Sequence, residues 1–135
     1  MKILQVTPTF YPSKFGGVKV VSYNLAKALS EHGHEVTVYT TDAELGSHRL
    51  RDFENFSQGN NFRVKYFKNL SNLLAYKYRI FLPIGIFFIA RKEINNFDIV
   101  HLHDFRSLYN IVIHYYCKKN KIPYIIFKLN NSQFY

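Results

Sequence analysis

An apolar strand, a glycine pair, an amphipathic helix and a second strand follow one another within residues 3–40. The first strand covers residues 3–6, the glycines are Gly16 and Gly17, and the second strand covers residues 35–40. The core-facing stripe of the helix is predicted from three- and four-residue spacing and comprises Val18, Val21, Leu25, Ala28, Leu29 and His32. This order predicts a right-handed βαβ unit and therefore a parallel sheet.

The glycine pair lies where the first strand gives way to the helix. Gly16 and Gly17 have no Cβ atom and can adopt a positive φ, so a ligand can approach the backbone there. The first N–H groups of the helix have no intrahelical partner and suit an anion. A plain strand-to-helix turn uses glycines in the same way, so both interpretations stay open. The loop lacks a G-x-G-x-x-G motif, which argues against a dinucleotide site.

A second informative segment covers residues 96–104. Its apolar strand ends in His101, His103 and Asp104, and ligands of open α/β sheets bind at the carboxyl ends of strands. The two histidines point to one face because side chains alternate along a strand. They fit an acceptor site, a pair of metal ligands, or core histidines bonded to the backbone. No third ligand with recognisable spacing follows Asp104, and no nucleophile elbow accompanies the pair.

Several segments together resemble the N-terminal half of the family-4 retaining glycosyltransferases, which have the two-domain GT-B fold. These segments are Ile3-Leu4-Gln5-Val6, Phe10-Tyr11-Pro12, Gly16-Gly17, Leu25-Ala26, Leu29, Gly33-His34-Glu35-Val36-Thr37-Val38 and Asp98-Ile99-Val100-His101-Leu102-His103. The resemblance implies an α/β fold with a Rossmann-like parallel sheet, helices on both faces, and one GT-B half domain. It also places the glycine loop at the interdomain cleft and His103 toward the acceptor pocket.

The resemblance implies roles for individual residues. The donor phosphate and sugar are expected at Gly16, Gly17, Lys14 and Lys19. Phe10, Tyr11 and His101 are expected at the acceptor, and His103 and Asp104 at the reacting groups. The nucleotide-sugar is a co-substrate, and we expect neither a further cofactor nor a metal.

Length and composition predict one domain, residues 1–135. The chain has 135 residues and 47% apolar content, which suffices for one core. We expect the donor-binding C-terminal domain to be absent, and the isolated chain to be inactive without such a domain or chain. The resemblance holds to about Phe127 and departs at Leu129, where the family has a histidine. The alternative function is a non-catalytic membrane-docking or partner-binding module, or a truncated remnant.

Charge favours anionic partners. Eighteen Lys and Arg residues against nine Asp and Glu residues give a formal net charge of +9. Basic and aromatic residues alternate over residues 62–92, which suits an anionic membrane surface, whereas no nucleic-acid-binding motif is present. The apolar run at residues 80–90 is too short to span a bilayer. A helix from Pro83 through Glu93 is expected either to pack on the sheet or to lie on a membrane.

The remaining segments complete the expected sheet. Residues 41–61 are expected to form a long loop carrying His48, Arg49 and Arg51, followed by a strand at 62–67, a helix at 105–120 and a buried strand at 122–127. The edge of that last strand is expected to pair with a second copy and give a homodimer. The single cysteine, Cys117, and the lack of a signal-peptide pattern predict a cytoplasmic protein, peripheral at the inner face of the membrane.

Overall fold

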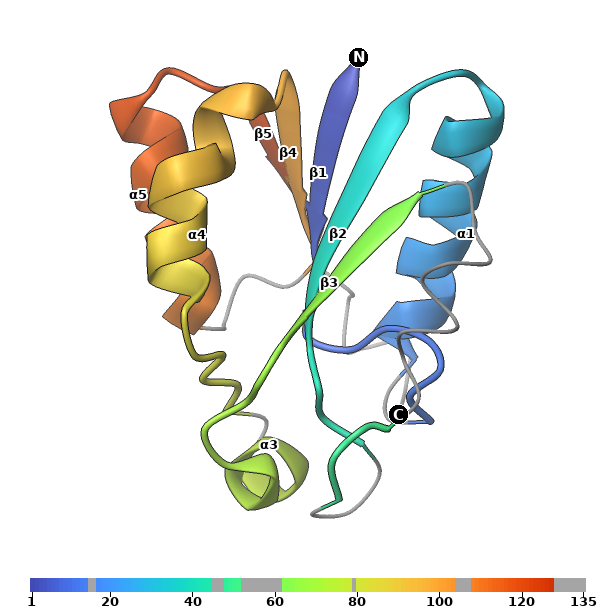
Figure 1. Cartoon of the computed structure of the whole chain (residues 1–135), viewed down its shortest axis with the longest axis vertical. Helices are drawn as coiled ribbons and strands as arrows, with labels where there is room; N and C mark the ends of the chain where they lie inside the picture. The colour runs from blue at the N-terminus through green and yellow to red at the C-terminus, as the bar shows by residue number, and fades with distance from the viewer. Residues whose placement is uncertain (15–16, 45–47, 52–61, 79, 104–107, 128–135) are drawn as a thin grey trace.

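A five-stranded parallel sheet forms the centre of the molecule (Figure 1). The computed structural model describes residues 1–14, 17–44, 48–51, 62–78, 80–103 and 108–127. The strands are β1 (Lys2–Val6), β2 (Glu35–Thr41), β3 (Arg63–Phe67), β4 (Ile99–Leu102) and β5 (Tyr124–Ile126). Their order is β3-β2-β1-β4-β5, and every neighbouring pair is parallel. The Rossmann-like α/β fold predicted from the sequence is therefore confirmed.

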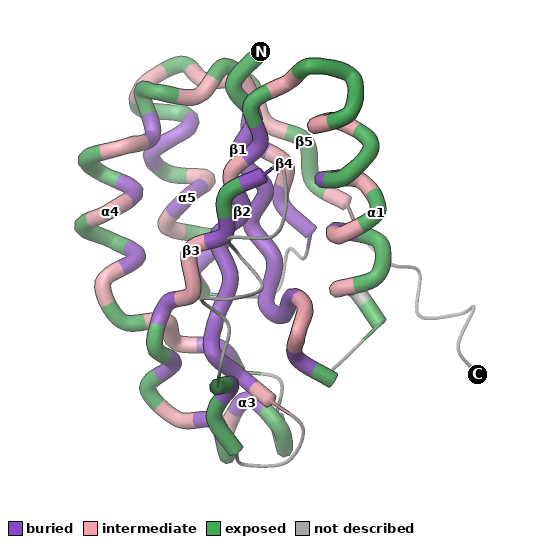
Figure 2. Tube along the Cα trace, turned by 45° about the vertical axis from the view of Figure 1, so that its right-hand side comes forward, coloured by how far each residue is buried: buried purple, intermediate pink, exposed green. Residues whose placement is uncertain are grey.

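Helices cover both faces of this sheet, as expected. Helix α1 (Val18–Glu31) lies on one face, and α4 (Ile86–Glu93) and α5 (Leu108–Lys119) lie side by side on the other (Figures 1 and 2). The short helix α3 (Asn72–Tyr78) sits below the carboxyl ends of the strands, and the 3-10 helix η1 (Ile94–Asn96) continues α4. Within the described residues, no helix has the length and apolar character that crossing a membrane requires.

Two apolar clusters fill the space between the sheet and its helices, because alternate strand residues point to opposite faces. The larger cluster lies under α4 and α5 and includes Leu4, Val6, Ile94, Val100, Leu102 and Ile113. The other lies under α1 and includes Ile3, Phe10, Ala26, Val36, Val38 and Phe62. Figure 2 shows that buried residues concentrate in the central strands.

The core-facing stripe of α1 differs from the predicted one. Ser22 and Ala26 are buried, whereas the predicted core residues Val21, Ala28 and His32 are exposed. Leu25 and Leu29 are half-buried, and the side chain of Val18 is outside the described part. The small side chains of Ser22 and Ala26 allow the helix to approach the strands closely, so they occupy the buried stripe.

Helix α4 begins later than predicted. Gly85 adopts a left-handed conformation with φ 84° and forms the N-cap, so the first helical residue is Ile86. Pro83 lies before the helix, in a β-bridge with Asn69. Helix α3 was not predicted, because its seven residues are too few to show a helical period.

Two other predicted segments differ in detail. Strand β2 extends to Thr41, and residues 48–51 of the predicted loop are tied back to it, with the Leu50 amide donating to the Asp42 carbonyl at 2.7 Å. Strand β5 is shorter than residues 122–127 and is not buried, since Ile125 is 52% and Ile126 is 45% exposed. Among the described strands, β5 is an edge strand, so one flank has no neighbour to cover it.

Candidate functional site

The candidate site lies at the ends of β1 and β4, the two adjacent strands from which the sheet is built outward. From β1 the chain adds β2 and then β3 toward one edge, and from β4 it adds β5 toward the other edge, so the strand order changes direction between β1 and β4. Val6 pairs with Leu102, and the His103 amide donates to the Val6 carbonyl at 2.9 Å. The carboxyl ends of β1 and β4 therefore lie side by side at the point where the strand order changes direction, which is where ligands bind in open α/β sheets.

The loop between β1 and α1 is held against the ends of β2 and β3. The hydrogen bonds that attach residues 7–14 include Thr41 Oγ1 to the Pro8 carbonyl (2.7 Å), Ser13 Oγ to the Ala43 carbonyl (2.8 Å), the Lys14 amide to Glu44 Oε1 (2.7 Å), and the Tyr66 hydroxyl to the Tyr11 carbonyl. Burial raises the pKa of the Tyr66 hydroxyl, which keeps it a donor. The loop is thus positioned before any ligand arrives.

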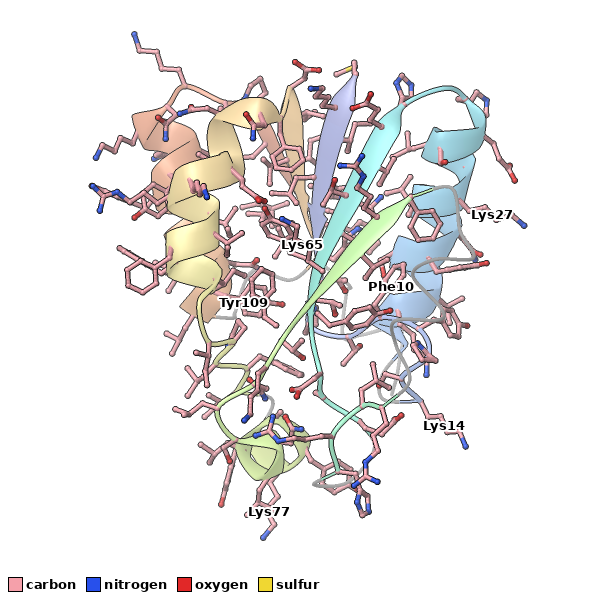
Figure 3. All side chains as sticks on the ribbon, in the orientation of Figure 1. Phe10, Lys14, Lys27, Lys65, Lys77 and Tyr109 are labelled. Atoms are coloured by element: carbon pink, nitrogen blue, oxygen red, sulfur yellow. The ribbon has the colours of Figure 1, made fainter. Side chains whose placement is uncertain are left out.

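Phe10 is part of the core. Its ring is fully buried and packs edge-on against Phe62 at 5.9 Å between centroids, and against Tyr23 at 6.1 Å. Figure 3 shows Phe10 between the sheet and α1. The expectation that Phe10 contacts the acceptor is not supported, because its ring is covered by protein. Its role is to anchor the loop.

Tyr11 and Lys19, expected at the acceptor and at the donor, come together at the start of α1. The Lys19 ammonium lies 5.6 Å from the centroid of the Tyr11 ring, in cation–π geometry. Desolvation lowers the pKa of Lys19, and the nearby charge of Glu44 opposes this by raising it. Lys14, in contrast, is exposed and points away from the molecule (Figure 3). Within the described part of the chain, the ammonium group of Lys19 is held by this contact with Tyr11, and that of Lys14 has no such contact.

Gly17 caps the N-terminus of α1 with φ −92° and ψ −19°, so it does not use the positive φ that glycine can adopt. A Cβ atom built on Gly17 meets nothing within 4 Å, and therefore neither backbone geometry nor packing requires glycine there. The first turn of α1 has no side-chain cap and no acidic residue. Within the described residues, no side chain of the helix itself therefore neutralises its positive end, and the carboxylate that acts on Lys19 is that of Glu44. Gly16 lies outside the described residues.

His101 and His103 form a stacked pair on the face of the sheet that carries α1. Their ring centroids are 4.3 Å apart with 24° between the planes, and the edge of Phe127 faces both rings. His103 is 1% exposed, whereas His101 is half-buried. The Nε2 atom of His103 lies 3.3 Å from Oε1 of Gln5 on β1. The two histidines therefore share one face, as predicted.

Both rings are neutral at neutral pH. Burial lowers the pKa of His101, and burial together with the charge of His101 lowers the pKa of His103 to about 3. The Gln5 oxygen can only accept a hydrogen bond, so we assign the proton of His103 to Nε2. His103 Nδ1 then carries a lone pair and, among the described residues, has no hydrogen-bond partner. The atom is buried, so it is a potential acceptor for a ligand hydroxyl group only after that group has displaced what covers it.

Gln5 was not identified as a site residue from the sequence. Its side chain is fully buried, and its Nε2 atom has no hydrogen-bond partner in the part of the chain that the structure describes. The available signal was a polar residue inside the apolar strand Ile3-Leu4-Gln5-Val6, because buried polar groups are normally paired. Asp104 and Leu129 lie outside the described residues. Within the described residues, no three His, Cys, Asp or Glu side chains gather as metal ligands.

The family model described as Glycosyltransferase Family 4 matches residues 15–127, which is most of the chain. No curated protein matches the sequence.

Proposed function

Because the chain belongs to glycosyltransferase family 4, we propose that it is the acceptor-binding, N-terminal domain of a retaining hexosyltransferase. In this proposal the donor is a nucleotide-sugar, and the acceptor is a glycan or a lipid-linked sugar. A donor-binding domain, on the same or a second chain, completes the cleft. The observation that carries the proposal is the buried, neutral His103 beside the fixed β1–α1 loop at the reversal of strand order.

On the donor side, the start of α1 stabilises negative charge. The leaving diphosphate gains charge as the sugar departs, so preformed donors and cations aimed at it lower the barrier. The open helix N-terminus at Gly17 and the Lys19 ammonium provide these groups. The hydrogen bonds that fix the loop mean that it needs little reorganisation at the moment of transfer.

On the acceptor side, His103 orients a hydroxyl group. Its Nδ1 atom is buried in the isolated chain, and in this proposal acceptor binding uncovers it, so that its lone pair accepts the hydroxyl hydrogen and directs the oxygen toward the anomeric carbon. Gln5 keeps the proton on Nε2, so that Nδ1 stays an acceptor. A ring with a pKa of about 3 is a weak base. His103 therefore contributes mainly by orienting the hydroxyl group, and not by removing its proton.

The proposal is tested by following the backbone amides of the isotope-labelled chain by NMR. We titrate inorganic pyrophosphate, UDP-glucose and GDP-mannose, and expect weak, saturable shifts at residues 17–20 and at the loop after β1. Gly17→Ala places a methyl group in the open space and should abolish these shifts. Lys27→Ala, on the exposed side of α1, is the matched control and should leave them unchanged.

Two results contradict the proposal. If none of the three ligands shifts an amide of the loop, the donor site at α1 is wrong. If the purified chain alone turns over a nucleotide-sugar efficiently, the requirement for a donor-binding domain is wrong.

A further inference from the structure

The outer surface of α4 and α5 is apolar where a globular protein is normally polar. We call it the α4–α5 face, and its residues are Ile84, Phe87, Phe88, Leu108, Ile111 and Tyr115. Their exposed fractions run from 46% for Phe87 to 72% for Phe88. Single exposed apolar residues are common, but a contiguous cluster marks a surface that contacts something else.

The two helices form one continuous surface. They lie side by side in both Figure 1 and Figure 2, and the ring of Phe87 on α4 packs edge-on against Tyr116 on α5 at 5.6 Å. A groove of about 340 Å³ opens beside them, near the start of both helices. Its lining is almost entirely apolar and includes Leu70, Phe81, Pro83, Ile86, Tyr109 and Val112.

Cations follow the apolar residues along each helix. On α4, Phe87 and Phe88 are succeeded one turn later by Arg91 and Lys92, all exposed. On α5, the exposed stripe is Leu108, Ile111, Tyr115, Lys118 and Lys119. Each helix thus presents bulky apolar groups over its first half and positive charge over its second. A helix that lies in a lipid headgroup region combines these two features.

Carboxylates are scarce around this surface. Among the described residues from 62 to 127, the acidic side chains are Glu93 and Asp98. Glu93 pairs with Lys65 at 2.6 Å, and Asp98 accepts a hydrogen bond from the Lys2 amide at the amino edge of the sheet. The same range holds nine described cations, which are Arg63, Lys65, Lys68, Lys77, Arg91, Lys92, Lys118, Lys119 and Lys121. The complementary partner is therefore anionic.

We propose that the α4–α5 face docks on an anionic lipid bilayer. The rings of Phe87, Phe88 and Tyr115 enter the headgroup boundary, and the cations of both helices meet lipid phosphates. A protein partner fits less well, because lysine is depleted at protein–protein interfaces and forms most of the charge here. Both helices start at the carboxyl edge of the sheet, so docking brings the candidate site close to the membrane.

The chain contains no tryptophan, which permits a clean fluorescence test. Phe88→Trp places a single reporter on the α4–α5 face, and Val21→Trp places one at an exposed position of α1. Each variant is mixed with vesicles of phosphatidylcholine alone, or of phosphatidylcholine with phosphatidylglycerol. We expect a blue shift only for Phe88→Trp with the anionic vesicles, and a weaker shift as salt is added.

Charge removal provides the matched comparison. In the Phe88→Trp background, Arg91→Gln with Lys92→Gln should weaken vesicle binding about 25-fold, at about fivefold per cation. Lys27→Gln, which removes an outward-pointing cation from α1 (Figure 3), should change binding by no more than about twofold. Ile111→Ser should also weaken binding to the anionic vesicles, because it removes apolar contact area.

Three results overturn the proposal. The first is equal binding to neutral and anionic vesicles, and the second is binding that Arg91→Gln with Lys92→Gln leaves unchanged. The third is a blue shift without lipid that grows with protein concentration and coincides with a dimer in sedimentation, which assigns the face to a second copy. If the tryptophan variant does not fold, cosedimentation of the unmodified chain with the same vesicles measures whether the chain binds anionic lipid in preference to neutral lipid.

Discussion

In most proteins apolar residues are buried and polar residues are exposed. The two faces of this sheet depart from that rule in opposite ways. On the α1 face, polar side chains of the strands are inside: Gln5 and His103 are buried, and each has an atom without a hydrogen-bond partner among the described residues. On the opposite face the strands bury apolar side chains, with Asn110 of α5 as a buried polar exception, but Phe88 and Ile111 are outside. Buried unpaired polar groups reduce stability, and clustered exposed apolar groups promote association. Neither feature helps the domain fold, so each indicates contact with another molecule.

Helix α5 contains both kinds of apolar position, and this gives the largest expected effect. Ile113 is fully buried, whereas Ile111 is 60% exposed two residues earlier. Ile113→Ala should lower the free energy of unfolding by about 2–5 kcal/mol, and Ile111→Ala by no more than about 0.5 kcal/mol. Urea unfolding followed by circular dichroism measures both. Equal losses would mean that the outer face of α5 packs against protein.

The buried histidine makes stability depend on pH. The pKa of His103 is about 3 in the folded protein and near 6.5 when the chain is unfolded. Between these values the unfolded chain binds more protons, so stability falls as the pH drops below about 6.5, by about 1.4 kcal/mol per unit. His101, whose pKa is also lowered, acts in the same direction. His103→Leu should flatten this dependence, and an unchanged slope would show that the imidazole is not buried as described.

Removing the polar pair should stabilise the domain. Gln5 and His103 contact each other, and leucine has a volume close to both. Gln5→Leu combined with His103→Leu removes both unpaired atoms, so we expect the free energy of unfolding to rise by about 1 kcal/mol. Each single substitution leaves the other polar group unpaired and should be less favourable than the double one. A double variant less stable than either single variant would argue for a structural role of the pair.

The sheet could be predicted from the sequence because its strands have strong local signals. Ile3-Leu4-Gln5-Val6 and residues 35–40 are apolar or β-branched runs bounded by turns. Which face of each helix is buried was harder to predict from the sequence. The buried stripe of α1 depends on how closely Ser22 and Ala26 approach the strands, which is a tertiary effect that residue spacing does not contain. In α5, apolar residues occupy both faces, so periodicity did not distinguish Ile111 from Ile113.

The candidate site was predictable in position but not in every residue. The carboxyl ends of β1 and β4 were expected to bind ligands, and the structure brings Tyr11 and Lys19 together there. Phe10 was placed incorrectly, because an aromatic residue in a loop gives no sign that Phe62 and Tyr23 will enclose it. Gln5 was missed because its relation to His103 spans two strands that are distant in the sequence.

The smallest expected effect on stability is that of Gly17→Ala. This substitution tests whether ligand binding at α1 and vesicle binding through the α4–α5 face are independent, without disturbing the fold. The residue has φ −92°, and a Cβ atom there meets nothing within 4 Å. Alanine is a poorer N-cap than glycine by about 0.5–1 kcal/mol, and its lower entropy in the unfolded chain offsets most of this, so Gly17→Ala should change stability by less than about 0.5 kcal/mol. Pyrophosphate-induced amide shifts should nevertheless disappear, while vesicle binding through the α4–α5 face stays unchanged. Loss of both binding activities together would show that the two surfaces are not independent.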